Sequence, residues 1–241
     1  MNTVPVTMPT GHTLRVLEHR ARAHNFETWE SEALRAICAV LRPGSVVFDV
    51  GAEEGEFSAL YGLITGPENV HLFEPTPSVW PNIRAVWEAN HSAPPGGMWP
   101  GFVGAATDTR GPPQDMRLWP ACANGDVQRD SRFSVVIERP DIPCLPLDAA
   151  ALFALPDVVV VDVEGAECRV VEGSERLMAG GCGKPPHFFV SVHPPEFLAR
   201  FGPTSTQEHL FRAFSRHGYS ARWVSTDHES HWHFAPPRWT P

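Results

Sequence analysis

The stretch VVFDVGAEEGEFSAL, residues 46–60, decides the fold that the sequence predicts. An apolar, β-branched run leads into a turn that contains Gly51 and Gly55, and the apolar residues after this turn recur at helical intervals. Glycine permits the positive φ angles and the close approach to a ligand that a tight strand-to-helix turn requires. The stretch therefore predicts a strand, a ligand-binding turn and a helix.

The same alternation continues along the chain. Short β-branched runs predict buried strands, and segments with helical periodicity separate them. This pattern is typical of an α/β fold with a mostly parallel sheet, helices on both faces and, here, an antiparallel closing strand pair. The expected strands are 46–50, 70–73, 102–105, 158–162 and 187–193, the expected helices 56–64, 77–90, 166–178 and 206–217, and the closing strands 219–225 and 231–236.

Two regions flank or interrupt this alternation. Residues 1–41 are expected to form a helical lead-in, irregular at 1–11 and with one or two helices between Leu14 and Leu41. The remaining residues, 42–241, form one α/β domain. Turn dipeptides at about 107–140 predict an irregular insert with a strand near 133–137, and we consider this insert a candidate wall of an acceptor pocket.

Composition excludes several classes of partner. The net charge of -9, without a cluster of Lys and Arg, argues against nucleic acid. No apolar run reaches the roughly 20 residues that a bilayer crossing needs, so no membrane partner is expected. Five cysteines without paired spacing and an N-terminus unlike a signal peptide favour free thiols and a cytoplasmic location.

Glu74 ends the second expected strand in VHLFEPTP, 23 positions after Gly51. In α/β nucleotide-binding folds an acidic residue at roughly this offset binds ribose hydroxyls. The G-x-G-x-x-G spacing that accommodates a pyrophosphate is absent, so a ligand without phosphates fits better. Alternatively, the glycines only turn the chain and Glu74 caps the helix that begins near Pro77.

Four segments resemble a known family: VVFDVGAEEGEFSALYGLI at 46–64, VHLFEPTPSVWPNIRAVWEAN at 70–90, LPLDAAALFALPDVVVVDVEGAECRVVEGSERLM at 145–178 and GYSARWVSTDHESHWHFAP at 218–236. Together they resemble FkbM-type methyltransferases, which use S-adenosylmethionine and have the class I Rossmann-like fold. The resemblance spans about residues 42–237 and departs from the family pattern at Glu53, Val160 and Ser191. It implies an S-adenosylmethionine cofactor and a hydroxyl acceptor on a small molecule or saccharide.

The chemistry of this cofactor agrees with the opening stretch. The methyl donor is a sulfonium cation that also bears an ammonium group, so a turn rich in carboxylates suits it, and free N–H groups at the helix start can bind its carboxylate. Glu74 is assigned to the ribose hydroxyls, Gly51 and the Glu53 region to the methionine portion, and residues 103–106, at the end of the expected third strand, to the adenine. The predicted cofactor-binding residues are Asp49, Gly51, Glu53, Gly55, Glu74, Pro75, Ala105, Ala106 and Asp162.

Methyl transfer to a hydroxyl requires a base at the strand ends. His193 is the first choice, because the ordinary pKa of histidine, about 6.5, lies near the operating pH. Asp162 and Glu164 follow the 158–162 strand, and His228 is the tail histidine expected to face the acceptor. The alternatives are that His193 caps its strand and that Asp162 caps the following helix.

The histidine-dense tail TDHESHWHF also admits a divalent metal bound with Asp162 or Glu164, although alternating His and Trp on an edge strand is more often a half-buried surface, and no ligand set is assigned. The function predicted from the sequence is S-adenosylmethionine-dependent O-methylation. The alternatives are an N- or carboxyl-methyltransferase of the same fold and a non-catalytic cofactor-binding module. The oligomeric state is not predicted.

Overall fold

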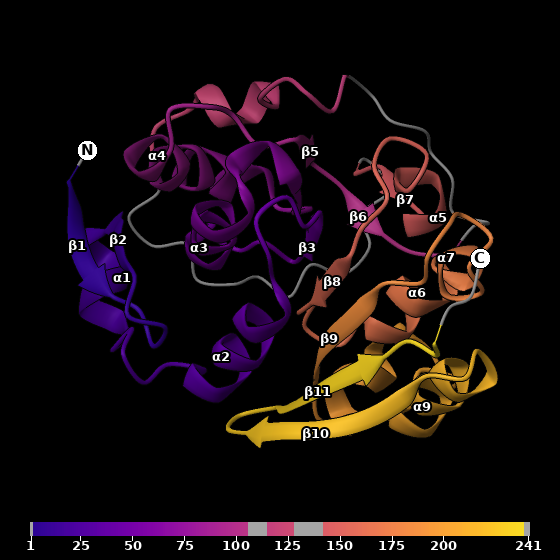
Figure 1. Ribbon diagram of the computed structural model, residues 1–241. Coiled ribbons are helices and arrows are strands. Elements are labelled where there is room, and N and C mark those ends of the chain that lie inside the picture. The colour runs from indigo at the N-terminus through magenta and orange to yellow at the C-terminus, as the bar shows by residue number, and fades with distance from the viewer. Residues whose placement is uncertain (1, 106–114, 128–141, 239–241) are drawn as a thin grey trace.

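A seven-stranded sheet organises the chain in the computed structural model, which describes residues 2–105, 115–127 and 142–238 (Figure 1). Its strand order is β10-β11-β9-β8-β3-β4-β5. The strands from β9 to β5 are parallel, whereas β11 is antiparallel to β9 and β10 to β11. The predicted mostly parallel sheet with an antiparallel closing pair is therefore confirmed. The strand bounds are β3 (Val47–Val50), β4 (Val70–Phe73), β5 (Gly97–Trp99), β8 (Val158–Val161), β9 (His187–Val192), β10 (Ser220–Thr226) and β11 (Ser230–Ala235).

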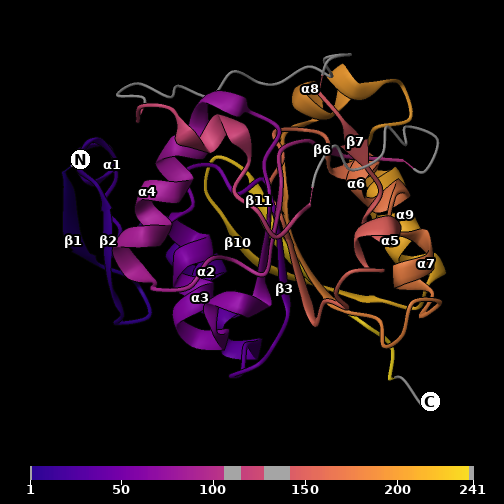
Figure 2. The same ribbon diagram turned by 90° about the horizontal axis from the view of Figure 1, so that it is seen from above.

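Helices cover both faces of this sheet (Figure 2). Alternate strand residues point to opposite faces, so Val47 and Val160 belong to one apolar core and Phe48 and Val161 to the other. The helices that pack on the face with Val47 are α2 (Ser31–Val40), α3 (Glu56–Thr65) and α4 (Trp80–Asn90). The helices that pack on the face with Phe48 are α5 (Leu147–Ala150), α6 (Glu167–Glu172), α7 (Glu175–Met178) and α9 (Gln207–Arg216). Shorter helical pieces are η1 (Pro67–Asn69), η2 (Pro77–Val79), η4 (Ala121–Asn124), α8 (Pro195–Leu198) and η5 (Ala199–Phe201).

The N-terminal segment is a β-hairpin followed by helices, which corrects the prediction of an irregular 1–11 and a helix from Leu14. Strands β1 (Thr3–Thr7) and β2 (Thr13–Leu17) pair antiparallel, and α1 (Glu18–Ala23) follows directly. Leu14 and Val16 are fully buried at a spacing of two, a strand period that the helical assignment overlooked. The Asn90 amide on α4 bonds to both backbone groups of Arg15, which fixes the hairpin on α4.

The third parallel strand is β5, not the predicted 102–105 strand. Phe102–Val103 forms β6, which pairs with β7 (Cys144–Leu145) in a separate two-stranded sheet. Glycine has a low strand propensity, so the sequence pattern did not indicate β5. A Cβ at Gly97 would overlap the His71 ring of the neighbouring strand. Glycine at this position lets β4 and β5 lie close together. Trp99, at the end of β5, is fully buried in the core.

Two further predictions are modified. The single helix expected over 166–178 is divided into α6 and α7 at Gly173, where a Cβ would collide with the Gly104 carbonyl oxygen. The strand expected near 133–137 lies outside the described residues. Residues 115–127 of the insert pack on α4, where Arg84 Nη1 donates to Asn124 Oδ1 at 2.7 Å. Among the residues that the structure describes, no helix is both long and apolar enough to cross a bilayer.

The turn after β3 depends on glycine at position 51, whose φ is +93°. A Cβ there would collide with the backbone carbonyl oxygen of Asp162. We expect Gly51→Ala to lower the free energy of unfolding by more than about 3 kcal/mol, because left-handed strain of roughly 1–2 kcal/mol adds to this collision. Urea denaturation measures the change.

Gly44→Ala is the matched control, because Gly44 has a φ of +84° and no atom lies within 4 Å of its added Cβ. It should cost only the strain, roughly 1–2 kcal/mol. Equal losses for the two variants would show that the contact with Asp162 does not constrain the turn.

Candidate functional site

A cavity of about 400 Å³ lies where β3, β4 and β8 end. In α/β sheets, ligands bind outside the carboxyl ends of the strands, and this volume falls in the range of small-molecule sites. The loops after these three strands line one side, and the segment between α1 and α2 lines another. The lining residues include Gly51, Glu53, Glu74, Pro75, Asp162, Glu164 and His228, together with His24, Trp29 and Glu30.

The turn after β3 folds back over the end of β4. Gly51, Glu53 and Gly55 have φ angles of +93°, +51° and +83°. The N–H groups of Gly51 and Ala52 both donate to the Phe73 carbonyl, at 2.8 and 3.2 Å. A Cβ on Gly55 would lie 3.2 Å from Ile83 Cγ2, so this glycine seats the turn on α4.

Glu74 extends from the end of β4 into this cavity and is 7% exposed. Its two carboxylate oxygens accept backbone N–H groups from Thr76 at 2.7 Å and from Glu53 at 3.2 Å. Burial raises the pKa of Glu74 to about 7, and the two N–H donors oppose this increase. Glu74 therefore joins the two loops and also borders the cavity.

The charges of the acidic turn are largely paired within the protein. Arg20 on α1 is 4% exposed, and its guanidinium lies 2.7 Å from Glu53 and 2.7 Å from Glu56. Burial alone would lower the pKa of Arg20, but the surrounding glutamates raise it, so the guanidinium stays charged. His19 lies 2.9 Å from Glu54. Among the acidic residues of the turn, Glu53 lines the large cavity, whereas Glu54 and Glu56 do not.

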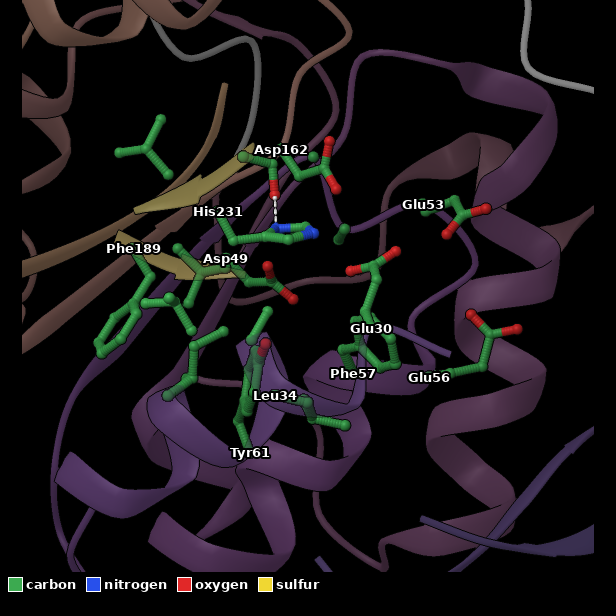
Figure 3. A pocket seen from close by; sticks show the side chains of 18 of the residues that line it. Glu30, Leu34, Asp49, Glu53, Glu56, Phe57, Tyr61, Asp162, Phe189 and His231 are labelled. Carbon is green, nitrogen blue, oxygen red and sulfur yellow. Dashed lines mark hydrogen bonds between the residues drawn. The ribbon is translucent and has the colours of Figure 1, made fainter. Parts of the chain in front are cut away.

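A smaller cavity of about 60 Å³ adjoins the first and contains Asp49 (Figure 3). Its walls come from α2, α3 and the ends of β3, β9 and β11, and it shares Glu30, Glu53 and Asp162 with the larger cavity. Ser58 donates a hydrogen bond to Asp49, and burial raises the pKa of Asp49 to about 6. Asp49 therefore lies behind the turn from Gly51 to Gly55 and does not line the large cavity.

His193, at the end of β9, is enclosed by carboxylates. Its Nδ1 lies 2.6 Å from Glu167, and its Nε2 lies 2.8 Å from Glu229 and 3.4 Å from Glu164. Burial alone would lower the pKa of His193, but hydrogen bonding to these carboxylates raises it well above its ordinary value. His193 is 5% exposed and lines neither cavity, so it lacks the accessible free nitrogen that a general base needs.

The other predicted residues are distributed unevenly. Asp162, Glu164 and His228 meet at the large cavity, as the strand-end argument expects. Ala105 is described but does not line it, and Ala106 lies outside the described residues. Phe102 and Val103 line the cavity, and Val103 belongs to the segment predicted to contact the adenine. Cys168 on α6 is 1% exposed and packs as a thiol in the apolar core.

Sequence reasoning missed the contribution of the N-terminal segment. Arg20, Trp29 and Glu30 reach the site from before the α/β domain, and Trp29 stacks on His24 with ring centroids 4.1 Å apart. A buried Arg on a short helix and a non-glycine residue with positive φ, Glu30 at +47°, leave no periodic signal in the sequence. The segment between α1 and α2, together with Arg20 on α1, therefore completes the site.

Comparison with known proteins gives structural matches only, since no protein-family model and no curated protein matches the sequence. Methyltransferase FkbM from Methylobacillus flagellatus KT superposes with a TM-score of 0.50 at 18% identity, over 82% of this chain and 45% of that one. The chain shares the fold of this methyltransferase. It spans less than half of the other protein's length.

Two further structures match less closely. Precorrin-6y C5,15-methyltransferase from Geobacter metallireducens GS-15 has a TM-score of 0.46 at 12% identity, over 86% of this chain and 88% of its own. Magnesium protoporphyrin IX methyltransferase from Synechocystis PCC 6803, solved with bound SAM, has a TM-score of 0.45 at 11% identity, over 86% and 76%.

The Arg20 ion cluster generates a stability prediction. Arg20→Met leaves Glu53 and Glu56 without their buried counter-charge, which typically costs about 3–5 kcal/mol. Arg22→Met removes the same charge from a side chain that is 76% exposed and pairs with Glu18 at the surface; it should cost under about 1 kcal/mol. Chemical denaturation that gave similar losses for both would contradict the role assigned to Arg20.

Proposed function

We propose that the protein is an S-adenosylmethionine-dependent methyltransferase that methylates a hydroxyl group of a small molecule or saccharide. The observation that supports this best is the buried Glu74 at the end of β4, which faces a cavity of about 400 Å³ across the glycine turn. A carboxylate at this position suits the two hydroxyls of a ribose. The Rossmann-like arrangement of the strands supports the same conclusion.

The lining residues suit the separate parts of this cofactor. Glu74 and Pro75 would bind the ribose, and Phe102 and Val103 would pack against the adenine. The turn from Gly51 to Glu53 would hold the methionine portion. No array of phosphate-binding groups is needed, which agrees with the absence of a G-x-G-x-x-G motif.

The bound cofactor supplies an electrophilic methyl group, and the chain's own residues must position the acceptor and remove its proton. The Glu164 side chain is 43% exposed and lines the cavity, so we assign it the role of the base that removes the proton from the acceptor hydroxyl. Asp162 borders the same space and has a positioning role. We assign His193 the role of orienting these two carboxylates, because its Nε2 lies 3.4 Å from Glu164 and 3.9 Å from Asp162.

The acceptor side of the cavity favours a polar substrate with an apolar face. Trp29 offers an aromatic surface of the kind that stacks on sugar rings, and Glu30 and His228 offer hydrogen-bonding groups beside it. Trp99 is fully buried in the core, and neither Trp119 nor Trp232 lines this cavity. The net charge of -9 disfavours a nucleic-acid acceptor.

Turnover on an acceptor panel tests the whole proposal. Purified protein with S-adenosylmethionine should release S-adenosylhomocysteine when glycans or hydroxylated natural products are added, and Glu164→Gln should lower turnover while leaving S-adenosylhomocysteine affinity unchanged. Methylation of amines or carboxyls alone would support the other acceptor classes, and cofactor binding without any transfer would support a non-catalytic module.

Removal of the ribose-binding carboxylate gives a direct prediction. Glu74→Ala should weaken S-adenosylhomocysteine binding at least about tenfold, because hydrogen bonds to charged groups contribute roughly 1.5–3 kcal/mol each. Isothermal titration calorimetry measures this change. Glu196→Ala, which removes the same charge at an exposed position on α8, is the control and should leave affinity unchanged. Unaltered affinity in Glu74→Ala would overturn the ribose assignment.

Binding should also depend on pH through the same group. Burial raises the pKa of Glu74 to about 7, and the ionised carboxylate is the better acceptor of hydroxyl protons. Affinity for S-adenosylhomocysteine should therefore strengthen as the pH rises from about 5.5 to 7, by up to roughly tenfold per unit, and level off above 7. Glu74→Gln cannot ionise and should lose this slope; the same slope in both proteins would contradict the assignment.

A further inference from the structure

Three donor side chains meet beside the large cavity: Asp162 after β8, His193 after β9 and Glu229 before β11. One ligand atom from each lies within 4.8 Å of the others. Nε2 of His193 is 2.8 Å from Glu229 Oε2 and 3.9 Å from Asp162 Oδ1. Ligands bound at about 2.1 Å to one cation lie about 3 Å apart, so this spacing is near that of a metal site.

Glu229 provides a second, independent observation. It is 3% exposed, and within the described part of the chain its Oε1 atom has no hydrogen-bond partner. A buried carboxylate oxygen without a donor is costly, and such groups require an explanation. A cation in contact with Glu229 would provide the missing partner.

On the Nδ1 side of the His193 ring lies a buried carboxylate, as is common for metal-binding histidines. Nδ1 contacts Glu167 Oε1 at 2.6 Å, and Glu167 is fully buried and accepts the Gly165 N–H at 3.1 Å. Metal-binding histidines commonly donate their second ring nitrogen to a carboxylate, which fixes the ring and directs the other nitrogen at the metal. Glu167 thereby holds Nε2 toward Asp162 and Glu229.

We propose that Asp162, His193 and Glu229 bind a first-row divalent cation such as Mn²⁺ or Zn²⁺. One imidazole and two carboxylates form a donor set that suits these ions. Glu164 Oε2 lies at the same edge, 3.4 Å from His193 Nε2, but is not part of the donor set, so it stays available for the acceptor's proton. Asp162 and Glu164 also line the large cavity, so the cation borders the acceptor space. On the proposed function, it would polarise the acceptor hydroxyl.

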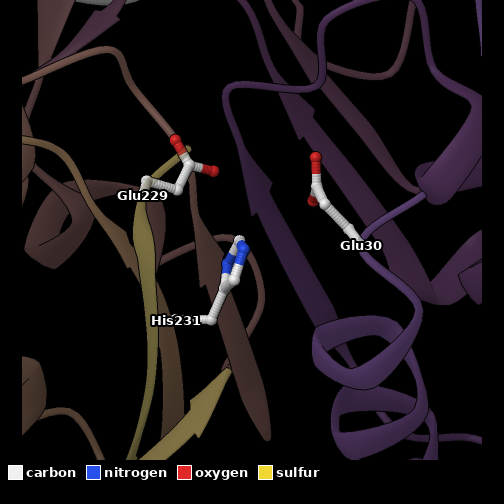
Figure 4. Close-up of side chains that lie close together, drawn as sticks. All are labelled: Glu30, Glu229 and His231. Carbon is white, nitrogen blue, oxygen red and sulfur yellow. The ribbon is translucent and has the colours of Figure 1, made fainter. Parts of the chain in front are cut away.

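Two other donor sets share Glu229 and are less suited. In the first, Glu30 and His231 face Glu229 (Figure 4), but both ring nitrogens of His231 already contact Ser191 and Asp227, at 3.0 and 3.1 Å. In the second, with Asp227 and His228, the His228 side chain is 64% exposed, and its two ring nitrogens already contact Asp227 at 2.9 Å and Glu229 at 3.4 Å.

Titration of chelator-treated protein with MnCl₂, followed by the electron paramagnetic resonance signal of free Mn²⁺, tests the proposal without cofactor or acceptor. We expect one Mn²⁺ bound per chain and a rise in melting temperature with Mn²⁺. Asp162→Asn and Glu229→Gln should each weaken binding at least about tenfold, whereas Glu30→Gln and His228→Gln should change it less than about twofold.

No saturable Mn²⁺ binding by the wild-type protein, which needs no variant to fold, would overturn the proposal and leave His193 as an ion-paired ring. Loss of binding in Glu30→Gln or His228→Gln, with retention in Asp162→Asn, would overturn the ligand assignment. Calorimetry with S-adenosylhomocysteine on the same samples separates the two claims: cofactor binding without Mn²⁺ binding rejects only the metal site, and the reverse result rejects only the cofactor.

Discussion

The architecture of the site depends on how the chain tolerates many carboxylates at one edge of the sheet. Parallel strands bring their ends together, so Glu53, Glu74 and Asp162 meet although they are far apart in sequence. Buried negative charges repel one another unless a cation or N–H donors compensate them. Arg20 compensates the turn after β3, and backbone N–H groups compensate Glu74.

This compensation explains why the N-terminal segment belongs to the site. Arg20 and Glu30 come from residues before β3, and the hairpin that precedes them is fixed on α4 through Asn90. The same segment places Trp29 on the cavity wall. An acidic turn that would otherwise repel its own neighbours is thus held in one conformation, and the cavity can keep its shape before a ligand binds.

The second acidic group, around His193, differs from the first in its central cation, which is a histidine and not an arginine. Histidine is a cation only while both ring nitrogens carry protons, and within the described part of the chain Glu229 Oε1 has no hydrogen-bond partner. The two acidic groups therefore have different roles. The ion pairs around Arg20 hold the turn in place, whereas the donors around His193 face one another at the cavity's edge, where a cation can bind them.

The sequence was sufficient for features that have a strong local signal. The run from Val46 to Leu60 fixed the central strand, its turn and its helix, because β-branched residues, glycines and helical spacing all agree there. It was insufficient where the deciding cause is a contact between distant residues. At position 97 the glycine is required because the His71 ring of the neighbouring strand lies where a Cβ would be. Nothing local indicates that Arg20 would neutralise Glu53 and Glu56 or that carboxylates would enclose His193.

The central claim is that the cavity at the ends of β3, β4 and β8 holds S-adenosylmethionine, and a crystal structure with S-adenosylhomocysteine tests it most directly. The account predicts density with the ribose hydroxyls on Glu74, the adenine against Phe102 and Val103, and the amino-acid portion at the turn from Gly51 to Glu53. Density elsewhere on the molecule, or none at millimolar S-adenosylhomocysteine, would contradict it.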